Sequence, residues 1–135
     1  MSIALDEGQV NLKSLVQILE QAYISCTLNE RGDMASFTES SVKVMLQFDS
    51  DKMVVGLASL WGLKPISEVD KLRFVNRLND TITVVRFSIT SQGRLWCDHQ
   101  FQIKGGLNPR WFVFEVKRFA EICRGVVTVN SDFME

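Results

Sequence analysis

The chain has 135 residues, of which 46% are hydrophobic and 23% charged, with a formal net charge of −1 and a pI of about 5.9. This composition excludes a disordered chain and provides no broad basic surface for nucleic acid or for a membrane. The sequence has no run of about 18 apolar residues and no signal peptide, so we expect a soluble, cytoplasmic protein. The length is typical of a single domain, spanning residues 1–135.

The first half of the chain predicts a helix followed by three strands. The helix has Asn11 as its N-cap and covers residues 12–22, where apolar residues recur at helical spacing. Alternating apolar residues predict a half-buried strand over residues 23–30, followed by a hairpin of strands over residues 42–49 and 53–61. The second strand of this hairpin is more uniformly apolar, which is typical of a strand that is central in its sheet or covered on both faces.

The second half predicts a helix, a second hairpin and a last helix. Ser67 and Asp70 form a capping box at the start of a helix that ends at residues 79–80. The hairpin that follows consists of strands over residues 81–90 and 94–103, joined by a turn that contains glycine.

The last helix has the clearest start signal in the chain. Asn108 is expected to be its N-cap and Pro109 its first helical residue, and the helix is expected to end near Arg124. The complete predicted order is therefore α-β-β-β-α-β-β-α. Because the strands are mostly joined by tight turns, we expect an antiparallel sheet with helices packed on it, which is an α+β fold.

The single histidine and the three cysteines are the first candidates for chemistry. Cys97 and His99 are expected on the core-facing side of the fifth strand, and Cys26 and Cys123 could complete a metal site. Each thiol also fits the core as a small apolar side chain, and carboxylates such as Glu115 are expected on exposed helix faces. No catalytic motif is present, so we predict a protein that is not an enzyme and has no cofactor. A metal-dependent enzyme that uses Cys97 and His99 is one alternative.

The glycine pair Gly105 and Gly106 lies between the last predicted strand and the last helix. Such a junction can hold a phosphate on backbone N–H groups at a helix N-terminus. Here Asn108 is expected to occupy one donor by capping, and Pro109 has no N–H. The pattern favours a tight turn, and a small-ligand or nucleotide sensor that uses this junction is the alternative function.

Aromatic residues are more numerous than the predicted buried stripes require. The aromatic residues of the last helix spread over more than one helical stripe. In the second helix, Phe74 falls outside the apolar stripe, and Trp61 and Trp96 lie on strand faces. A surplus of this kind can form an apolar patch for a partner or a dimer. The predicted contact residues are Trp61, Phe74, Trp96, Trp111 and Phe114.

Two short motifs resemble the YbjN-like proteins, a family described as candidate bacterial sensory transduction regulators. The family has Asn-x-x-Asn at the end of its second helix, matched by Asn76 and Asn79, and Gly-Gly-Leu before the final helix, matched by Gly105, Gly106 and Leu107. The resemblance covers residues 65–123. It implies architectural roles for these residues, with the asparagines closing a helix end and the glycines a turn.

The resemblance also implies a fold like that of the type III secretion chaperones, whose members are often homodimers that bind a partner polypeptide over apolar grooves. Together with the missing catalytic motifs and the surplus aromatic residues, it predicts a chaperone-like interaction protein. We expect a homodimer that holds another polypeptide by apolar contacts or by strand addition at a sheet edge.

Overall fold

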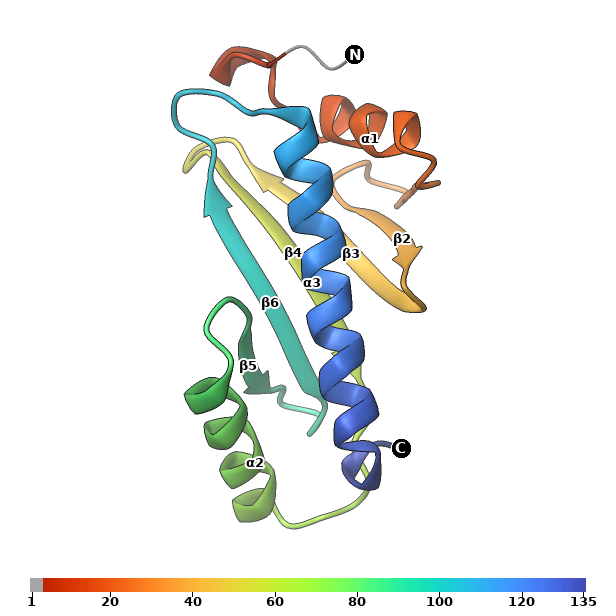
Figure 1. Ribbon diagram of the computed structural model, residues 1–135, viewed down its shortest axis with the longest axis vertical. Helices are drawn as coiled ribbons and strands as arrows, with labels where there is room; N and C mark the ends of the chain where they lie inside the picture. Colours follow the sequence, from red (N-terminus) through yellow and green to blue (C-terminus); the bar gives the residue numbers. More distant parts are fainter. Residues whose placement is uncertain (1–3) are drawn as a thin grey trace.

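The computed structural model describes residues 4–135, which form three α-helices and one six-stranded sheet (Figure 1). The helices are α1 (Leu12–Gln21), α2 (Glu68–Thr81) and α3 (Pro109–Val129), and short 3-10 turns lie at Glu7–Gln9 and Ser131–Phe133. The strands are β1 (Thr27–Leu28), β2 (Ala35–Glu39), β3 (Val42–Asp49), β4 (Val54–Trp61), β5 (Arg86–Ile89) and β6 (Leu95–Gln102).

All strand pairs are antiparallel, and the sheet order is β1-β2-β3-β4-β6-β5. α3 runs along one face of the sheet, α1 lies near the N-terminal end of α3, and α2 lies beside β5 (Figure 1). This arrangement confirms the predicted α+β class. Four strands precede α2 instead of the predicted three, because residues 35–39 form β2.

β2 has a weak sequence signal because it is short and its turn is unusual. Only Ala35 and Phe37 of this strand are buried. The turn into β3 consists of Ser40 and Ser41, with left-handed φ values of 52° and 65°, where two-residue hairpins usually have Asn or Gly. The strand predicted over residues 23–30 is wrong in its extent, since only the two residues of β1 pair and both are exposed.

The core lies between the inner face of the sheet and the helices. Alternate residues of the strands point inward, and each large apolar side chain buried there stabilises the fold by about 1.5–3 kcal/mol. The largest fully buried side chains are Leu15, Leu19, Val42, Val44, Leu46, Val55, Leu57, Phe74, Leu95, Ile103, Phe112 and Phe119. β4 is central, as its apolar sequence predicts, and its second face is partly open, since Leu60 is 39% exposed.

Helical spacing predicts a buried stripe of Val69, Leu72, Val75 and Leu78 on α2, and the structure buries only the second half of it. Phe74, Val75 and Leu78 are buried, whereas Leu72 is 49% exposed. Phe74 is 1% exposed and stacks on Phe133, with ring centroids 4.7 Å apart and planes 6° from parallel. The prediction that Phe74 lies outside the buried stripe is therefore wrong, because the C-terminal 3-10 turn folds back onto α2.

α3 differs from its prediction in length and in one buried carboxylate. It extends to Val129, five residues past Arg124, and its C-terminal turns also bury Val126. Glu115 was expected on an exposed face but is 7% exposed. Its carboxylate lies 3.0 Å from His99 Nε2 of β6, which explains why a charged residue is tolerated there.

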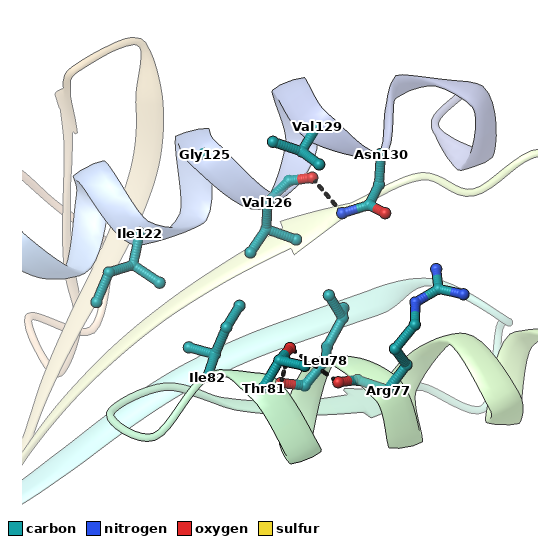
Figure 2. Close-up of a pocket in the computed structure, with 9 residues that line it drawn as sticks. All are labelled: Arg77, Leu78, Thr81, Ile82, Ile122, Gly125, Val126, Val129 and Asn130. Atoms are coloured by element: carbon teal, nitrogen blue, oxygen red, sulfur yellow. Dashed lines mark hydrogen bonds between the residues drawn. The ribbon is translucent and has the colours of Figure 1, made fainter.

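α2 and α3 do not close onto each other at their C-terminal ends (Figure 2). A groove of about 470 Å³ separates them, which we call the α2–α3 groove. It is lined by Arg77, Leu78, Thr81, Ile82, Ile122, Gly125, Val126, Val129 and Asn130. Within residues 4–135, no helix combines the length and the apolar character needed to cross a bilayer.

Candidate functional site

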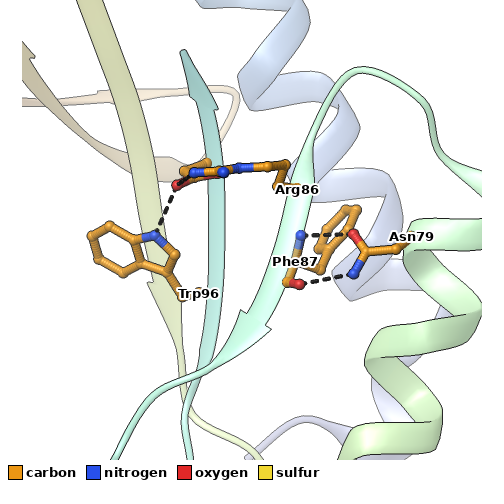
Figure 3. A network of polar contacts seen from close by, with 5 residues as sticks. Asn79, Arg86, Phe87 and Trp96 are labelled. Carbon is orange, nitrogen blue, oxygen red and sulfur yellow. Dashed lines mark hydrogen bonds and ion pairs between the residues drawn. The ribbon is translucent and has the colours of Figure 1, made fainter.

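The two edges of the sheet differ in how their backbone is protected. At the β5 edge, the Nδ2 group of Asn79 donates to the carbonyl oxygen of Phe87, and Asn79 Oδ1 accepts from the N–H of Phe87, both at 2.9 Å (Figure 3). The amide thus replaces a neighbouring strand and prevents pairing with another chain. Asn76, one turn earlier, is exposed, and α2 continues past both residues to Thr81. Asn79 therefore caps a sheet edge rather than a helix end.

The opposite edge of the sheet is open. β1 pairs with β2 only at Ala35 and Ser36, so within residues 4–135 the last three residues of β2 have no strand on the side away from β3. The two-residue turn pairs Glu39 with Val42, and alternation along β2 then directs the N–H and C=O of Thr38 away from β3. These groups are free to pair with an added strand.

A hollow of about 460 Å³ lies beside this open edge. It is lined by Tyr23, Ile24, Ser25, Thr27, Ser36, Phe37, Thr38, Glu39 and Lys43. Tyr23 is 97% exposed and has a left-handed φ of 65°. A bulky residue in this conformation is rare, and strain of this kind is often found at binding sites. Sequence reasoning did not identify this edge, because its position depends on where β1 ends.

Two of the exposed aromatic residues lie on α3. Trp111 is 43% exposed and Phe114 is 62% exposed. The Trp111 ring meets Phe101 of β6 edge to face, with centroids 5.0 Å apart and an interplanar angle of 83°. Trp111 and Phe114 are three residues apart, so they lie on the same side of α3 as an apolar patch, and Trp111 joins this patch to the sheet.

The other two tryptophans lie on opposite faces of the sheet and are held by hydrogen bonds. Trp61 Nε1 donates to Ser59 Oγ at 2.9 Å, and Trp96 Nε1 donates to Asp98 Oδ2 at 3.2 Å. Arg86 binds both oxygens of the same Asp98 carboxylate at 2.9 Å, and this interaction raises the pKa of Arg86 (Figure 3). Both tryptophans are half-buried, so they expose less surface than the pair on α3.

Three of the four candidate metal ligands are divided between two separate contacts, and the fourth, Cys26, is half-buried just before β1. Cys97 of β6 and Cys123 of α3 are fully buried, and Ser59 Oγ donates to Cys123 Sγ at 3.4 Å. The contact with the Cys123 thiol, together with burial, raises the pKa of Cys97, which keeps its thiol protonated. His99 pairs with Glu115 instead. Residues 4–135 contain no cluster of three or more His, Cys, Asp or Glu side chains that could hold a metal ion.

The glycine junction is closed by the N-terminal segment of the chain. Gly105 N–H donates to the Glu7 carboxylate, Gly106 N–H donates to the Ile103 carbonyl, and the backbones of Leu5 and Leu107 form a two-way bridge. The φ values of Gly105 and Gly106 are 92° and 110°, which are left-handed.

The next donors along the chain are also occupied. The Asn108 Oδ1 atom accepts from the N–H groups of Arg110 and Trp111, and Pro109 begins α3 without an N–H. A phosphate at this junction would have to displace these internal contacts, so the arrangement gives no support to a nucleotide site.

Comparison with known proteins gives matches only at the level of structure. Neither a scan against protein-family models nor a search of curated proteins finds a match. YbjN from E. coli, described as a candidate transcription regulator, superposes with a TM-score of 0.77 at 12% identity, over 97% of this chain and 98% of its own. The fold is YbjN-like.

Two further matches relate the YbjN-like fold to type III secretion chaperones. A chain of the HopA1–SchA chaperone–effector complex has a TM-score of 0.61 at 13% identity, over 84% of this chain and 90% of its own. The Yersinia pestis chaperone SycH, solved with a stable fragment of YscM2, has a TM-score of 0.57 at 16% identity. The match covers 87% of this chain and 98% of the SycH chain. These matches confirm the predicted YbjN-like, chaperone-like fold.

We predict that Asn79→Ala destabilises the protein by about 1–2 kcal/mol, because it leaves the N–H and C=O of Phe87 without their partner. Asn76→Ala is the matched control and should change the free energy of unfolding by less than about 0.5 kcal/mol, as expected for an exposed residue. Urea denaturation of the two variants measures both values. Equal effects would show that Asn79 does not close the β5 edge.

We predict that Gly106→Ala costs more stability than Gly105→Ala. Both changes place a side chain at a left-handed φ, which costs about 1–2 kcal/mol. Only at Gly106 would the added Cβ collide with the carbonyl oxygen of Leu5, whereas the space beside Gly105 is open. Thermal unfolding of both variants compares the two costs, and a larger loss for Gly105→Ala would contradict the proposed close approach.

Proposed function

We propose that this protein is a cytoplasmic, chaperone-like module without enzymatic activity, which binds a second polypeptide by strand addition at the open edge of β2. The observation that carries the proposal is the free backbone of Thr38 beside the hollow lined by Tyr23. An extended peptide there would gain main-chain hydrogen bonds from β2 and a place for a side chain in the hollow.

The structural neighbours support binding of a polypeptide. The HopA1–SchA complex pairs a chaperone with an effector, and SycH was solved with a fragment of another protein. The patch of Trp111 and Phe114 on α3 would provide further apolar contact, because exposed aromatic residues are common anchors at interfaces. Trp61 and Trp96, which are half-buried, would have a smaller role.

We also propose that the module is a homodimer formed through α2. Val69 and Leu72 lie one turn apart on the exposed face of this helix, and they are 56% and 49% exposed. The same face of a second copy can meet them about a two-fold axis, which is the commonest symmetry among homo-oligomers. The dimer contact therefore moves from Phe74, which is buried, to these two residues.

Thr38→Pro tests the open edge. Proline removes the N–H that an added strand would use, and an edge strand tolerates it because this N–H faces away from β3. Polypeptides captured from lysate of the source cell should decrease about tenfold, which corresponds to the loss of one or two hydrogen bonds. Quantitative mass spectrometry compares the captured proteins.

Thr38→Val is the matched control, because it changes the side chain but retains the N–H, and it should capture as much as the unmodified protein. Circular dichroism checks that both variants fold. If Thr38→Pro captures the same proteins in the same amount, strand addition at β2 is wrong.

Leu72→Glu tests the dimer, because it places a charge at the centre of the proposed contact. Light scattering should give about twice 15.4 kDa for the unmodified protein and 15.4 kDa for the variant. Leu60→Glu, at an exposed leucine of β4, is the control and should remain dimeric. A monomeric mass for the unmodified protein at micromolar concentration would refute the dimer.

A further inference from the structure

The α2–α3 groove has one charged end and one apolar end (Figure 2). Arg77 and Asn130 lie at the same end, and Ile82 and Ile122 face each other across the other end. Apolar side chains of both helices line the length between them, and the volume of about 470 Å³ falls within the range of small-molecule sites. A ligand that matches this groove would be elongated, with one polar end.

Among the described residues, Arg77 is the only charged one that lines the groove. Within residues 4–135, no carboxylate forms a salt bridge with its guanidinium. The guanidinium carbon lies 5.6 Å from the ring centroid of Phe74 and 5.7 Å from that of Phe133, and these two rings stack on each other. The rings hold the cation in place and leave its N–H donors free, which suits a carboxylate.

Gly125 keeps the α3 side of the groove open. This glycine lies inside a helix, where it destabilises the helix by about 1 kcal/mol relative to alanine. Its φ is not left-handed, and a Cβ added at this position would meet nothing within 4 Å. Neither the backbone nor the packing of residues 4–135 requires a glycine here. A side chain at this position would instead project into the groove and shorten it.

We propose that the α2–α3 groove binds one molecule of a fatty-acid-type carboxylate, with its alkyl chain between α2 and α3 and its carboxylate on Arg77. The apolar lining and the single cation disfavour a nucleotide, whose several phosphate charges need several donors. A membrane surface is also disfavoured, because binding to anionic lipid uses a cluster of basic residues. The proposal adds a ligand to the module and does not depend on the proposed strand addition at β2.

Isothermal titration with sodium octanoate, decanoate and dodecanoate, each below its micellar concentration, tests the groove. We expect one binding site per chain, and affinity that increases several-fold for each pair of added methylene groups until the groove is filled. Saturation at several sites, or no saturable binding of dodecanoate, would overturn the proposal.

Three variants locate the binding. Arg77→Gln removes the charge and should weaken dodecanoate binding about tenfold or more. Gly125→Leu fills the groove and should abolish binding, and Gly125→Ala, which adds a single methyl group, should weaken it less while raising the melting temperature. Arg124→Gln is the matched control, because it removes an exposed charge next to Gly125 that does not line the groove.

The alternatives give different results in the same experiments. Binding to phosphatidylglycerol vesicles but not to dodecanoate would assign the surface to a membrane and overturn the proposal. A shift from dimer to monomer in Gly125→Leu, with unchanged dodecanoate binding, would show that a second copy covers the groove and would also overturn it. Because Gly125→Leu leaves β2 intact, it should still capture the polypeptide partner, so failure here is distinct from failure of the proposed function.

Discussion

The packing of α3 across the inner face of the sheet is the contact on which the rest of the structure depends. Phe112, Val116 and Phe119 cover the strands, and the buried cysteine pair and the His99–Glu115 contact lie along the same interface. Since only one side of α3 packs on the sheet, its other sides are available for other contacts. The aromatic patch lies toward its N-terminal end, and the α2–α3 groove lies toward its C-terminal end.

The protection of the sheet edges follows from where the helices lie. α2 runs beside β5 and supplies the amide that closes this edge, whereas no helix of residues 4–135 supplies such a group at the end of β2. Natural proteins usually close or shorten exposed edges to avoid aggregation. A sheet with one closed edge and one open edge is therefore consistent with a selective binding surface at the open edge.

The sequence predicts most of the fold because its strongest signals are local. Helix caps and alternating apolar residues identify the three helices and the two main hairpins. β2 is not predicted because its Ser40–Ser41 turn lacks the usual residues, and the burial of Phe74 is not predicted because its partner Phe133 lies far along the chain. The open edge and the groove depend on where separate helices and strands end relative to one another, which no local sequence pattern predicts.

The C-terminal segment links two regions that are remote in sequence. The backbone of Phe133 and Glu135 is hydrogen-bonded to the loop after β4, and Gly62 leaves room there for the Glu135 side chain. The same segment places the Phe133 ring under Arg77. Residues 133–135 therefore form a strap between the loop after β4 and the end of α2, and this strap helps to hold the cation at one end of the groove.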